Sequence, residues 1–565
     1  MPASRYLKMK RLSQKSSASF YCFGFSSKKS AKGITFFKLC FQSLWLIVSK
    51  LVLSGMTSPE KIRFKSYSQN QAMLLPPSLD EMIPSNHPVR VVSRVVDQID
   101  IRPLIRTYKG GGSSGYHPRM LLKVLIYAYL RNIYSSRQME DSLRENIYFM
   151  WLSGMNKPDH NTINRFRGKR LEGQLKDIFS AVVSLLAEEG HLSIKEVFVD
   201  GTKFEANANR YTFVWGKAIA TQKQKIKAQL ESLWAYAQKV YNTELQEPET
   251  PDFTEISAEK VEETIRQINQ KLKDKEIDRE VKKKLDYGAK HWPENLRKYQ
   301  TQQEILKQRN SFSKTDTDAT FMRTKEDHMK NGQLKPCYNW QFSTNNQFVV
   351  NYTVTQTTTD TTTLIEHLES HKLQYQNYPE TVTADSGYGS EENYQFIQEK
   401  QIEGFVKFNY FHKEQTRKLK EDIFRRENHY YNPEMDCFYC PMGQKMRKIG
   451  EGKRKTSTGF EQKVSYYQAQ NCQGCPLRWG CHKAKGERII EINHNLERHK
   501  QKARDLLLSP EGIEHRKQRP ADVEATFGNI KQNKGFRRFM LRGKQKVEIE
   551  TGLIALAHNL SKIRA

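Results

Sequence analysis

The stretch that decides the fold is Lys195-Glu196-Val197-Phe198-Val199-Asp200-Gly201-Thr202-Lys203-Phe204-Glu205-Ala206. It is apolar before Asp200 and rich in β-branched and aromatic residues, so it predicts a buried strand. A carboxylate at the end of a buried strand is unfavourable unless something pairs with it, and a divalent cation is the simplest partner. The alternative is a hairpin turn, because Asp-Gly is also a strong hairpin signal. This stretch alone does not separate the two interpretations.

The length of the chain indicates how many compact units it forms, and its net charge indicates what kind of partner it binds. A chain of 565 residues is too long for one ordinary domain, and about three or four compact units are expected. The net charge of +29 arises from 92 Lys and Arg residues against 63 Asp and Glu residues. Such an excess favours a polyanionic partner, and nucleic acid is the commonest one. A generally basic soluble protein is the alternative that charge leaves open.

Residues 1–55 differ from the rest of the chain. They are basic and Ser-rich at first, and then apolar from Ile34 to Leu53, although charged and polar residues interrupt the apolar run. Its uninterrupted core, Ser43 to Ser49, is too short to cross a membrane. Since Met56 resembles a natural start, we interpret residues 1–55 as a non-native or disordered extension outside the fold.

Residues 70–175 have a helical pattern and are predicted to form a DNA-binding domain. Pro118 suits the first position of a helix, and Asp159 suits the cap of a short polar and basic helix over residues 160–170. A turn followed by such a helix is what a helix-turn-helix reader needs, so we predict DNA contacts for Arg165 and Arg167. A solvated surface helix is the competing interpretation.

A charged helical region follows over residues 217–310. Its apolar residues recur at steps of four and three in two separate runs, namely Ile226, Leu230, Leu233, Ala237 and Val240, then Val261, Ile265, Ile268 and Leu272. This spacing predicts an apolar seam on two helices. A break near Pro248 and Pro251 separates them, so we expect an inserted antiparallel helical hairpin.

Strand signals return after this region. Residues 338–342 and 348–354 predict two strands with a turn at Asn345-Asn346, and Asp360 is predicted to cap a helix. A short strand then ends at Asp385, followed by a helix and a strand over residues 404–408. The order predicts a mixed α/β sheet over residues 190–408, completed by residues 505–562. Asp385 lies at the carboxyl end of a strand, where open sheets place their sites.

Three acids form the predicted active site. Asp200 and Asp385 end strands, and Glu524 lies on a predicted helix with a proline near its start. Three such carboxylates can hold two Mg²⁺ ions about 3.5–4 Å apart, with water completing the coordination. Lys531 follows Glu524 by two helical turns, so it lies on the same face and can hold a phosphate. Taken singly, Glu524 has a simpler explanation as an acid favoured by the helix dipole.

At these residues the chain resembles the DDE transposases of bacterial insertion sequences, and most closely the group named after insertion sequence eleven-eighty-two. The resemblance extends over about residues 70–562. It rests on an ordered set of motifs: Val199-Asp200-Gly201-Thr202-Lys203, Ala384-Asp385-Ser386-Gly387-Tyr388, Val523-Glu524-Ala525-Thr526-Phe527-Gly528-Asn529-Ile530-Lys531, Gly535-Phe536-Arg537-Arg538-Phe539 and Leu556-Ala557-His558-Asn559-Leu560.

The resemblance implies an RNase H-like catalytic domain with helical and cysteine-rich insertions, preceded by an all-helical domain. It implies Mg²⁺ or Mn²⁺ held by Asp200, Asp385 and Glu524. It also implies cleavage and strand transfer on double-stranded DNA, at the terminal inverted repeats and at a target. The resemblance further implies that the protein forms a homodimer in the DNA complex and has no small-molecule substrate. It also implies a cytoplasmic, nucleoid-associated location. Two alternatives are a catalytically inactive DNA-binding descendant and a non-specific divalent-metal nuclease. A membrane-anchored role for residues 34–53 is a third.

The wider superfamily often places a Tyr, an Arg, the Glu and a Lys at fixed spacing. Lys531 fits that spacing, but position 520 is Pro, with Arg519 one residue early, and Lys517 occupies the Tyr position. The roles of that Tyr and Arg therefore do not transfer directly. We assign DNA contacts to the basic residues around the acids, which are Lys203, Arg519, Lys531, Lys534, Arg537 and Arg538.

Residues 409–500 form a cysteine-rich insertion. Cys437 and Cys440 make one pair, Cys472 and Cys475 make a second, and both have the C-x2-C spacing of a tetrahedral zinc site. Cys481 lies close enough to substitute for one ligand. Four protein ligands leave no open position, so the predicted Zn²⁺ is structural. Unliganded thiols are the alternative.

Overall fold

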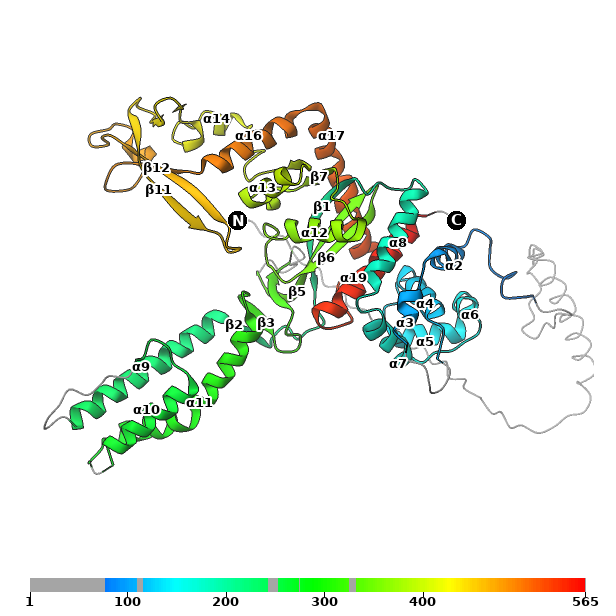
Figure 1. Ribbon diagram of the computed structural model, residues 1–565, viewed down its shortest axis with the longest axis horizontal. Coiled ribbons are helices and arrows are strands. Elements are labelled where there is room, and N and C mark those ends of the chain that lie inside the picture. Colours follow the sequence, from blue (N-terminus) through cyan, green and yellow to red (C-terminus); the bar gives the residue numbers. More distant parts are fainter. Residues whose placement is uncertain (1–76, 109–114, 242–251, 274, 325–331, 564–565) are drawn as a thin grey trace, which may run out of the picture. The chain divides into compact units, whose positions relative to one another are not determined.

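The computed structural model describes residues 77–108, 115–241, 252–273, 275–324 and 332–563 (Figure 1). Residues 1–55, with the apolar run 34–53, lie outside the described residues, so their interpretation remains a prediction. Within the described ranges, no helix has the length and the apolar character needed to cross a membrane.

A six-stranded mixed sheet holds the predicted strands. Its main order is β4 (Thr320–Arg323), β5 (Leu334–Asn345), β1 (Glu196–Glu205), β7 (Thr381–Ala384) and β8 (Glu403–Val406). β6 (Phe348–Thr355) pairs with β5. β1 is antiparallel to β5 and parallel to β7, and α12 (Leu364–Tyr375) and α13 (Glu391–Glu399) connect β6, β7 and β8. The predicted mixed α/β fold is confirmed, and the predicted strands and helices follow in the expected order, whereas β4 is an additional strand that was not predicted.

The pairing of β1 with β7 sets the positions of two acids. β1 continues unbroken to Glu205, so the hairpin interpretation of Asp200-Gly201 is wrong, and Asp200 lies within the strand rather than at its end. β7 pairs with β1 only as far as Val199 opposite Ala384. Asp200 and Asp385 are each the next residue after this pair. The two parallel strands therefore bring both acids to one edge of the sheet.

The turn between β5 and β6 differs from the prediction by one residue. Asn345 is the last residue of β5, and the turn is made by Asn346 and Gln347, whose φ angles are 51° and 62°. Two consecutive left-handed residues are typical of the tight hairpin turns that match strand twist.

Helices precede the sheet. They are α2 (Pro88–Gln98), α3 (Arg102–Arg106), α4 (Pro118–Leu130), α5 (Ser136–Glu145), α6 (Ile147–Ser153), α7 (His160–Arg165) and α8 (Leu175–Glu188). Pro118 begins α4, and Asp159 caps α7 by accepting a hydrogen bond from the Thr162 amide at 2.9 Å, as predicted. α7 continues into a π-helical turn, Phe166–Arg170. The helices share one apolar core with the sheet, so no break in the core marks a boundary at residue 175.

Three helices follow β1 and lie alongside one another (Figure 1). They are α9 (Gly216–Tyr241), α10 (Ala258–Lys271) and α11 (Arg279–Leu306). The two predicted apolar seams form a core of their own with Trp292 and Leu296 of α11, so the structure adds a third helix to the expected hairpin. Pro248 and Pro251 lie outside the described residues. The short strands β2 (Phe213–Trp215) and β3 (Ser311–Ser313) pair at the base of this segment.

The cysteine-rich segment forms a second sheet with a separate small core. Its strands are β9 (Tyr431–Asn432), β10 (Cys437–Tyr439), β11 (Lys445–Lys455), β12 (Glu461–Ala469) and β13 (Ile489–Ile492). The short helix α14 (Arg417–Lys420) precedes these strands, α15 (Arg478–Cys481) lies between β12 and β13, and α16 (His494–Leu508) leads back to the main sheet.

The last part of the chain departs from the prediction twice. α17 (Pro510–Arg519) continues through a π-helical turn (Pro520–Glu524), α18 (Ala525–Gly528) and a second π-helical turn (Asn529–Asn533), so Pro520 lies inside a helix rather than near its start. α19 (Lys544–Lys562) was expected to be amphipathic, but it is buried on nearly every side between residues 547 and 560. Asn559 both accepts from and donates to the backbone of Val349, which completes the edge of β6.

Candidate active site

The three predicted acids converge on Arg519. Its guanidinium lies 3.1 Å from the Asp200 carboxylate, 3.7 Å from Asp385 and 3.2 Å from Glu524. The Arg519 side chain is only 4% exposed, whereas those of Asp385 and Glu524 are about half exposed, at 47% and 55%. The structure therefore joins acids from β1, from the end of β7 and from the π-helical turn after α17 around one nearly buried cation.

The π-helical turn explains how Arg519 reaches Glu524. In an α-helix, residues four apart share a face, and a π-helical turn inserts one extra residue. Arg519 precedes Glu524 by five residues across the turn Pro520–Glu524, so it takes the place that the family spacing gives to position 520. The sequence carried a signal for this irregularity, because a proline inside a helix removes a backbone donor.

Two lysines lie beside the acids. The Lys531 ammonium donates to Thr202 Oγ1 at 2.8 Å and lies 4.9 Å from the centre of the Phe204 ring. Thr202 is two residues after Asp200, so both side chains point to the same face of β1. Lys407, which the sequence analysis missed, follows β8. Burial lowers its pKa, Arg519 lowers it further, and Asp385 opposes both effects.

A cavity of about 240 Å³ opens beside the acids. Asp200 and Asp385 line it together with Lys203, Lys531 and a further acid, Asp360. Asp360 was predicted to cap a helix, but Thr363 occupies the cap of α12, and Asp360 faces this cavity instead. The cavity is thus lined by a third carboxylate, that of Asp360, which the sequence analysis had assigned to a helix cap.

The two arginines predicted to bind DNA near α7 have different surroundings. Arg165 is exposed and lines a cavity of about 430 Å³ with Lys169 and Lys546. Arg167 is 3% exposed and donates to the Tyr129 hydroxyl at 3.2 Å, and this hydroxyl in turn donates to Glu550 at 3.2 Å. Burial raises the pKa of Glu550. The predicted DNA contact of Arg167 is therefore wrong, because this side chain lies in the core and cannot reach a phosphate.

Among the basic residues after Glu524, the DNA contact predicted for Lys534 is also wrong, because its side chain is buried. It is 6% exposed, and burial lowers its pKa to about 8. Arg537 and Arg538 are exposed, and the Arg538 guanidinium also donates to the backbone oxygens of Ala206 and Ala208. Exposure leaves Arg537 and Arg538 able to contact DNA.

The donor set of the site suits a hard divalent cation. Mg²⁺ and Mn²⁺ prefer oxygen ligands, and Asp200, Asp385 and Glu524 supply carboxylates. Among the residues that the structure describes, no three His, Cys, Asp or Glu side chains stand close enough to hold an ion. Arg519 instead supplies the positive charge between the carboxylates, so they must approach one another to become ligands.

The cysteines are only partly brought together. Cys440, Cys472, Cys475, Cys481 and His482 line one small cavity, but Cys437 does not. In the described part of the chain, both ring nitrogens of His482 lack a hydrogen-bond partner, and Cys481 accepts from Arg488 at 2.8 Å. These side chains are not at the spacing of metal ligands, so the structure by itself gives no support to bound zinc.

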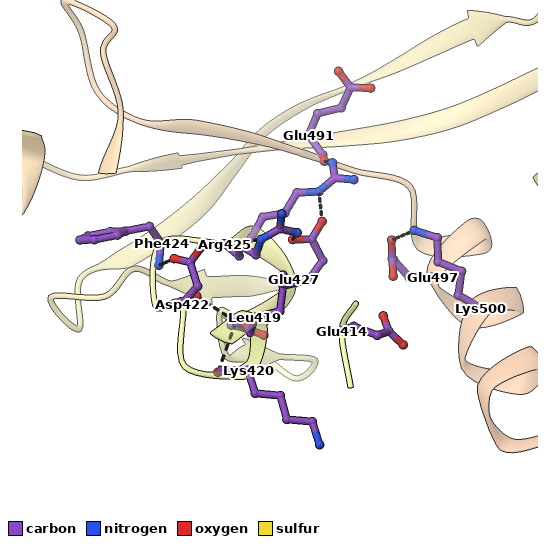
Figure 2. A network of polar contacts seen from close by, with 12 residues as sticks. Glu414, Leu419, Lys420, Asp422, Phe424, Arg425, Glu427, Glu491, Glu497 and Lys500 are labelled. Atoms are coloured by element: carbon purple, nitrogen blue, oxygen red, sulfur yellow. Dashed lines mark hydrogen bonds and ion pairs between the residues drawn. The ribbon is translucent and has the colours of Figure 1, made fainter. Parts of the chain in front are cut away.

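A further cavity, of about 680 Å³, lies between α16 and the segment that follows β8. Ion pairs surround it, including Lys500 with Glu497 at 2.9 Å, shown in Figure 2, and Arg504 with Glu414 at 2.8 Å. It shares Phe408, Asn409 and Tyr410 with a smaller cavity that Asp385 lines, so the two are adjacent.

Two family models match separate parts of the chain. Residues 439–564 match the family model described as "Transposase DDE domain", and residues 77–169 match the one described as "Transposase domain (DUF772)". These two parts of the chain are thus similar to transposase domains, which supports a DDE transposase of the insertion-sequence kind. The DDE match contains Glu524 and four of the five clustered cysteines, whereas Asp200, Asp385 and Cys437 precede it. A search of curated proteins found no match.

Proposed function

We propose that the protein is a DNA transposase that binds the terminal inverted repeats of an insertion sequence and carries out strand cleavage and strand transfer. The observation that carries the proposal is the convergence of Asp200, Asp385 and Glu524 around Arg519, in a chain of which two parts match transposase domains. The catalytic domain is RNase H-like in this proposal, and the group is that of insertion sequence eleven-eighty-two.

The reaction is phosphoryl transfer on DNA. Mg²⁺ or Mn²⁺ held by Asp200, Asp385 and Glu524 would activate the attacking hydroxyl and stabilise the leaving oxygen. Arg519 pairs with the three carboxylates and holds them close together before the ion binds. Lys531, fixed by its bond to Thr202, holds a phosphate next to them.

DNA contacts outside the acids come from several parts of the chain. We assign them to Arg165 on α7, to Lys203, and to Arg537 and Arg538. In this proposal the DNA strand continues from Asp385 past Tyr410, which is 54% exposed, toward the cations of the 680 Å³ cavity. Cations beside an exposed aromatic ring suit a nucleic acid backbone and its bases.

Further assignments complete the proposal. Residues 70–175 form the DNA-binding part, residues 217–310 and 409–500 are insertions, and two copies bridge the element ends. A structural Zn²⁺ binds the cysteine-rich segment. Because Cys481 lines the cavity with Cys440, Cys472 and Cys475, we propose it as the fourth ligand in place of Cys437.

The test is excision from a plasmid that carries the element's own ends, with Mg²⁺, by the full chain and by Asp385→Asn. We expect excision and strand joining by the unmodified chain and neither by the variant, with end binding retained in both. Equal cutting of plasmids without ends would instead identify a non-specific nuclease. Binding without cutting by the unmodified chain would identify an inactive DNA-binding descendant.

A further inference from the structure

Asp360 holds a cluster of polar side chains beneath the acids. Its Oδ1 accepts hydrogen bonds from the Asn339 amide at 2.8 Å and from the Gln341 amide at 3.0 Å, and both donors lie on β5. Gln341 is paired with Gly201 across the two strands. Neighbouring residues on a strand point to opposite faces, so this cluster lies on the face of β1 opposite the Asp200 carboxylate.

Asp360 packs directly against the backbone beside both strand-borne acids. A Cβ on Gly201 would lie 2.6 Å from Asp360 Oδ1, a distance that real contacts do not reach. A Cβ on Gly387 would meet the Asp360 Cβ at 3.7 Å. Gly201 follows Asp200, and Gly387 is two residues after Asp385. One side chain therefore spaces the two segments that carry these acids.

Hydrogen bonds extend the cluster to the turn after Asp385. The Tyr388 hydroxyl donates to Gln341 Oε1, and Thr361 Oγ1 donates to the Gly387 carbonyl at 3.0 Å. Tyr388 is 1% exposed and is the last residue of the 3₁₀ turn Ser386–Tyr388. Asp385 caps the start of this turn. The links from Asp360 through Gln341 to Tyr388 thus fix the turn that presents Asp385.

We propose that Asp360 is a positioning residue that sets the separation of Asp200 and Asp385, and with it the affinity of this pair for a divalent cation. The inference rests on the proposed function only in taking these two acids as metal ligands. Asp360 acts through the backbone and through Gln341, and it is not itself a ligand. Residues that orient metal ligands typically change metal affinity or activity by about 10–100-fold when they are replaced.

The test compares Asp360→Ala with Asp360→Asn in the full chain, with Mn²⁺ binding measured by calorimetry without DNA. An Asn oxygen can accept the same two amide bonds, so Asp360→Asn should bind Mn²⁺ within about threefold of the unmodified chain, whereas Asp360→Ala should bind about 10–100-fold more weakly. In excision assays, kcat of Asp360→Ala should fall while KM for DNA stays the same. Equal losses in both variants would show that the charge acts as a ligand, and unchanged affinity in Asp360→Ala would reject any role.

Tyr388→Phe provides a test that leaves Asp360 in place. It removes the hydroxyl link to the turn but keeps the buried ring, so Mn²⁺ affinity should fall in the same direction. Tyr375→Phe is the matched control, because Tyr375 donates to the Val350 carbonyl at 2.7 Å elsewhere in the same sheet. Equal affinities in the two variants would contradict the proposal. Because these measurements need no turnover, the proposal can fail while excision succeeds, or hold while excision fails.

Discussion

The Arg519 guanidinium lies 3.1 Å from the Asp200 carboxylate, in the position where a cation is needed to hold three acids together. Removing a nearly buried cation leaves its partner carboxylates repelling one another. We expect Arg519→Gln to lower the melting temperature in the absence of metal. Because Mg²⁺ can then neutralise the same carboxylates, excess Mg²⁺ should raise the melting temperature of this variant more than that of the unmodified chain.

Arg516→Gln is the control for this prediction. Arg516 lies on the same helix, its Nε donates to the Gly512 carbonyl, and its guanidinium lies over the Phe411 ring. Its Mg²⁺-dependent shift should equal that of the unmodified chain. If Mg²⁺ raised the melting temperature of Arg519→Gln only as much as that of the unmodified chain, Arg519 would not take the place of a metal cation.

Arg165 and Arg167 should respond differently to replacement by Ala. Arg165→Ala removes an exposed cation, so binding to the element ends should weaken and depend less steeply on salt, while the melting temperature stays unchanged. Arg167→Ala leaves Tyr129 and Glu550 buried without their cation, and should cost about 3 kcal/mol of the free energy of unfolding. Denaturant titration and DNA-binding isotherms measure the two effects. Equal stability of the two variants would contradict the burial of Arg167.

His558 predicts a loss of stability in mild acid. Burial lowers its pKa from 6.5 to about 4, and its Nε2 lies 2.8 Å from the Gln347 carbonyl. Between these two pKa values the unfolded chain binds more protons than the folded chain, so stability rises with pH and is lost as pH falls from 6.5 toward 4. One such proton is worth about 1.4 kcal/mol per pH unit.

His558→Gln tests this assignment, since Gln keeps a donor for the same carbonyl but does not titrate. The dependence of the free energy of unfolding on pH should become less steep between pH 4 and 6.5 in the variant. Buried His371, whose pKa is also lowered to about 4, continues to titrate in both proteins. An unchanged slope would show that His558 is not the group responsible.

Zinc content distinguishes the two candidate cysteine sets. Elemental analysis of the full chain should find about one Zn²⁺ per molecule. If Cys481 is the fourth ligand, Cys437→Ser should keep the metal and Cys481→Ser should lose it. The opposite pattern would restore the set given by the two C-x2-C pairs, and no zinc in the unmodified chain would mean that the thiols are unliganded.

Local patterns predicted most of the fold. The apolar runs of β1 and β7 and the cap at Asp159 are determined by residues close together in sequence, and the structure confirms them. The turn before β6 was predicted from the same kind of signal and is displaced by one residue. The order of strands and helices followed from the same signals. This was enough to bring Asp200 and Asp385 to one edge of the sheet.

Features that depend on distant partners could not be predicted. Arg167 resembles a surface residue until Glu550, on the last helix, is placed beside it. Asp360 resembles a helix cap until β5 supplies Asn339 and Gln341. The position of Arg519 depends on a π-helical turn, whose extra residue no spacing rule for α-helices anticipates. In each case tertiary contacts override a local preference.

Excision by Glu524→Gln, compared with Asp522→Asn, tests the central claim most directly. Asp522 is two residues away and buried, and it accepts from the Gln347 amide at 3.0 Å, away from the acid cluster. With Mg²⁺ and the element's own ends, Glu524→Gln should bind the ends but lose excision, while Asp522→Asn should retain it. Normal excision by Glu524→Gln would contradict the assignment of Glu524 as the third acid.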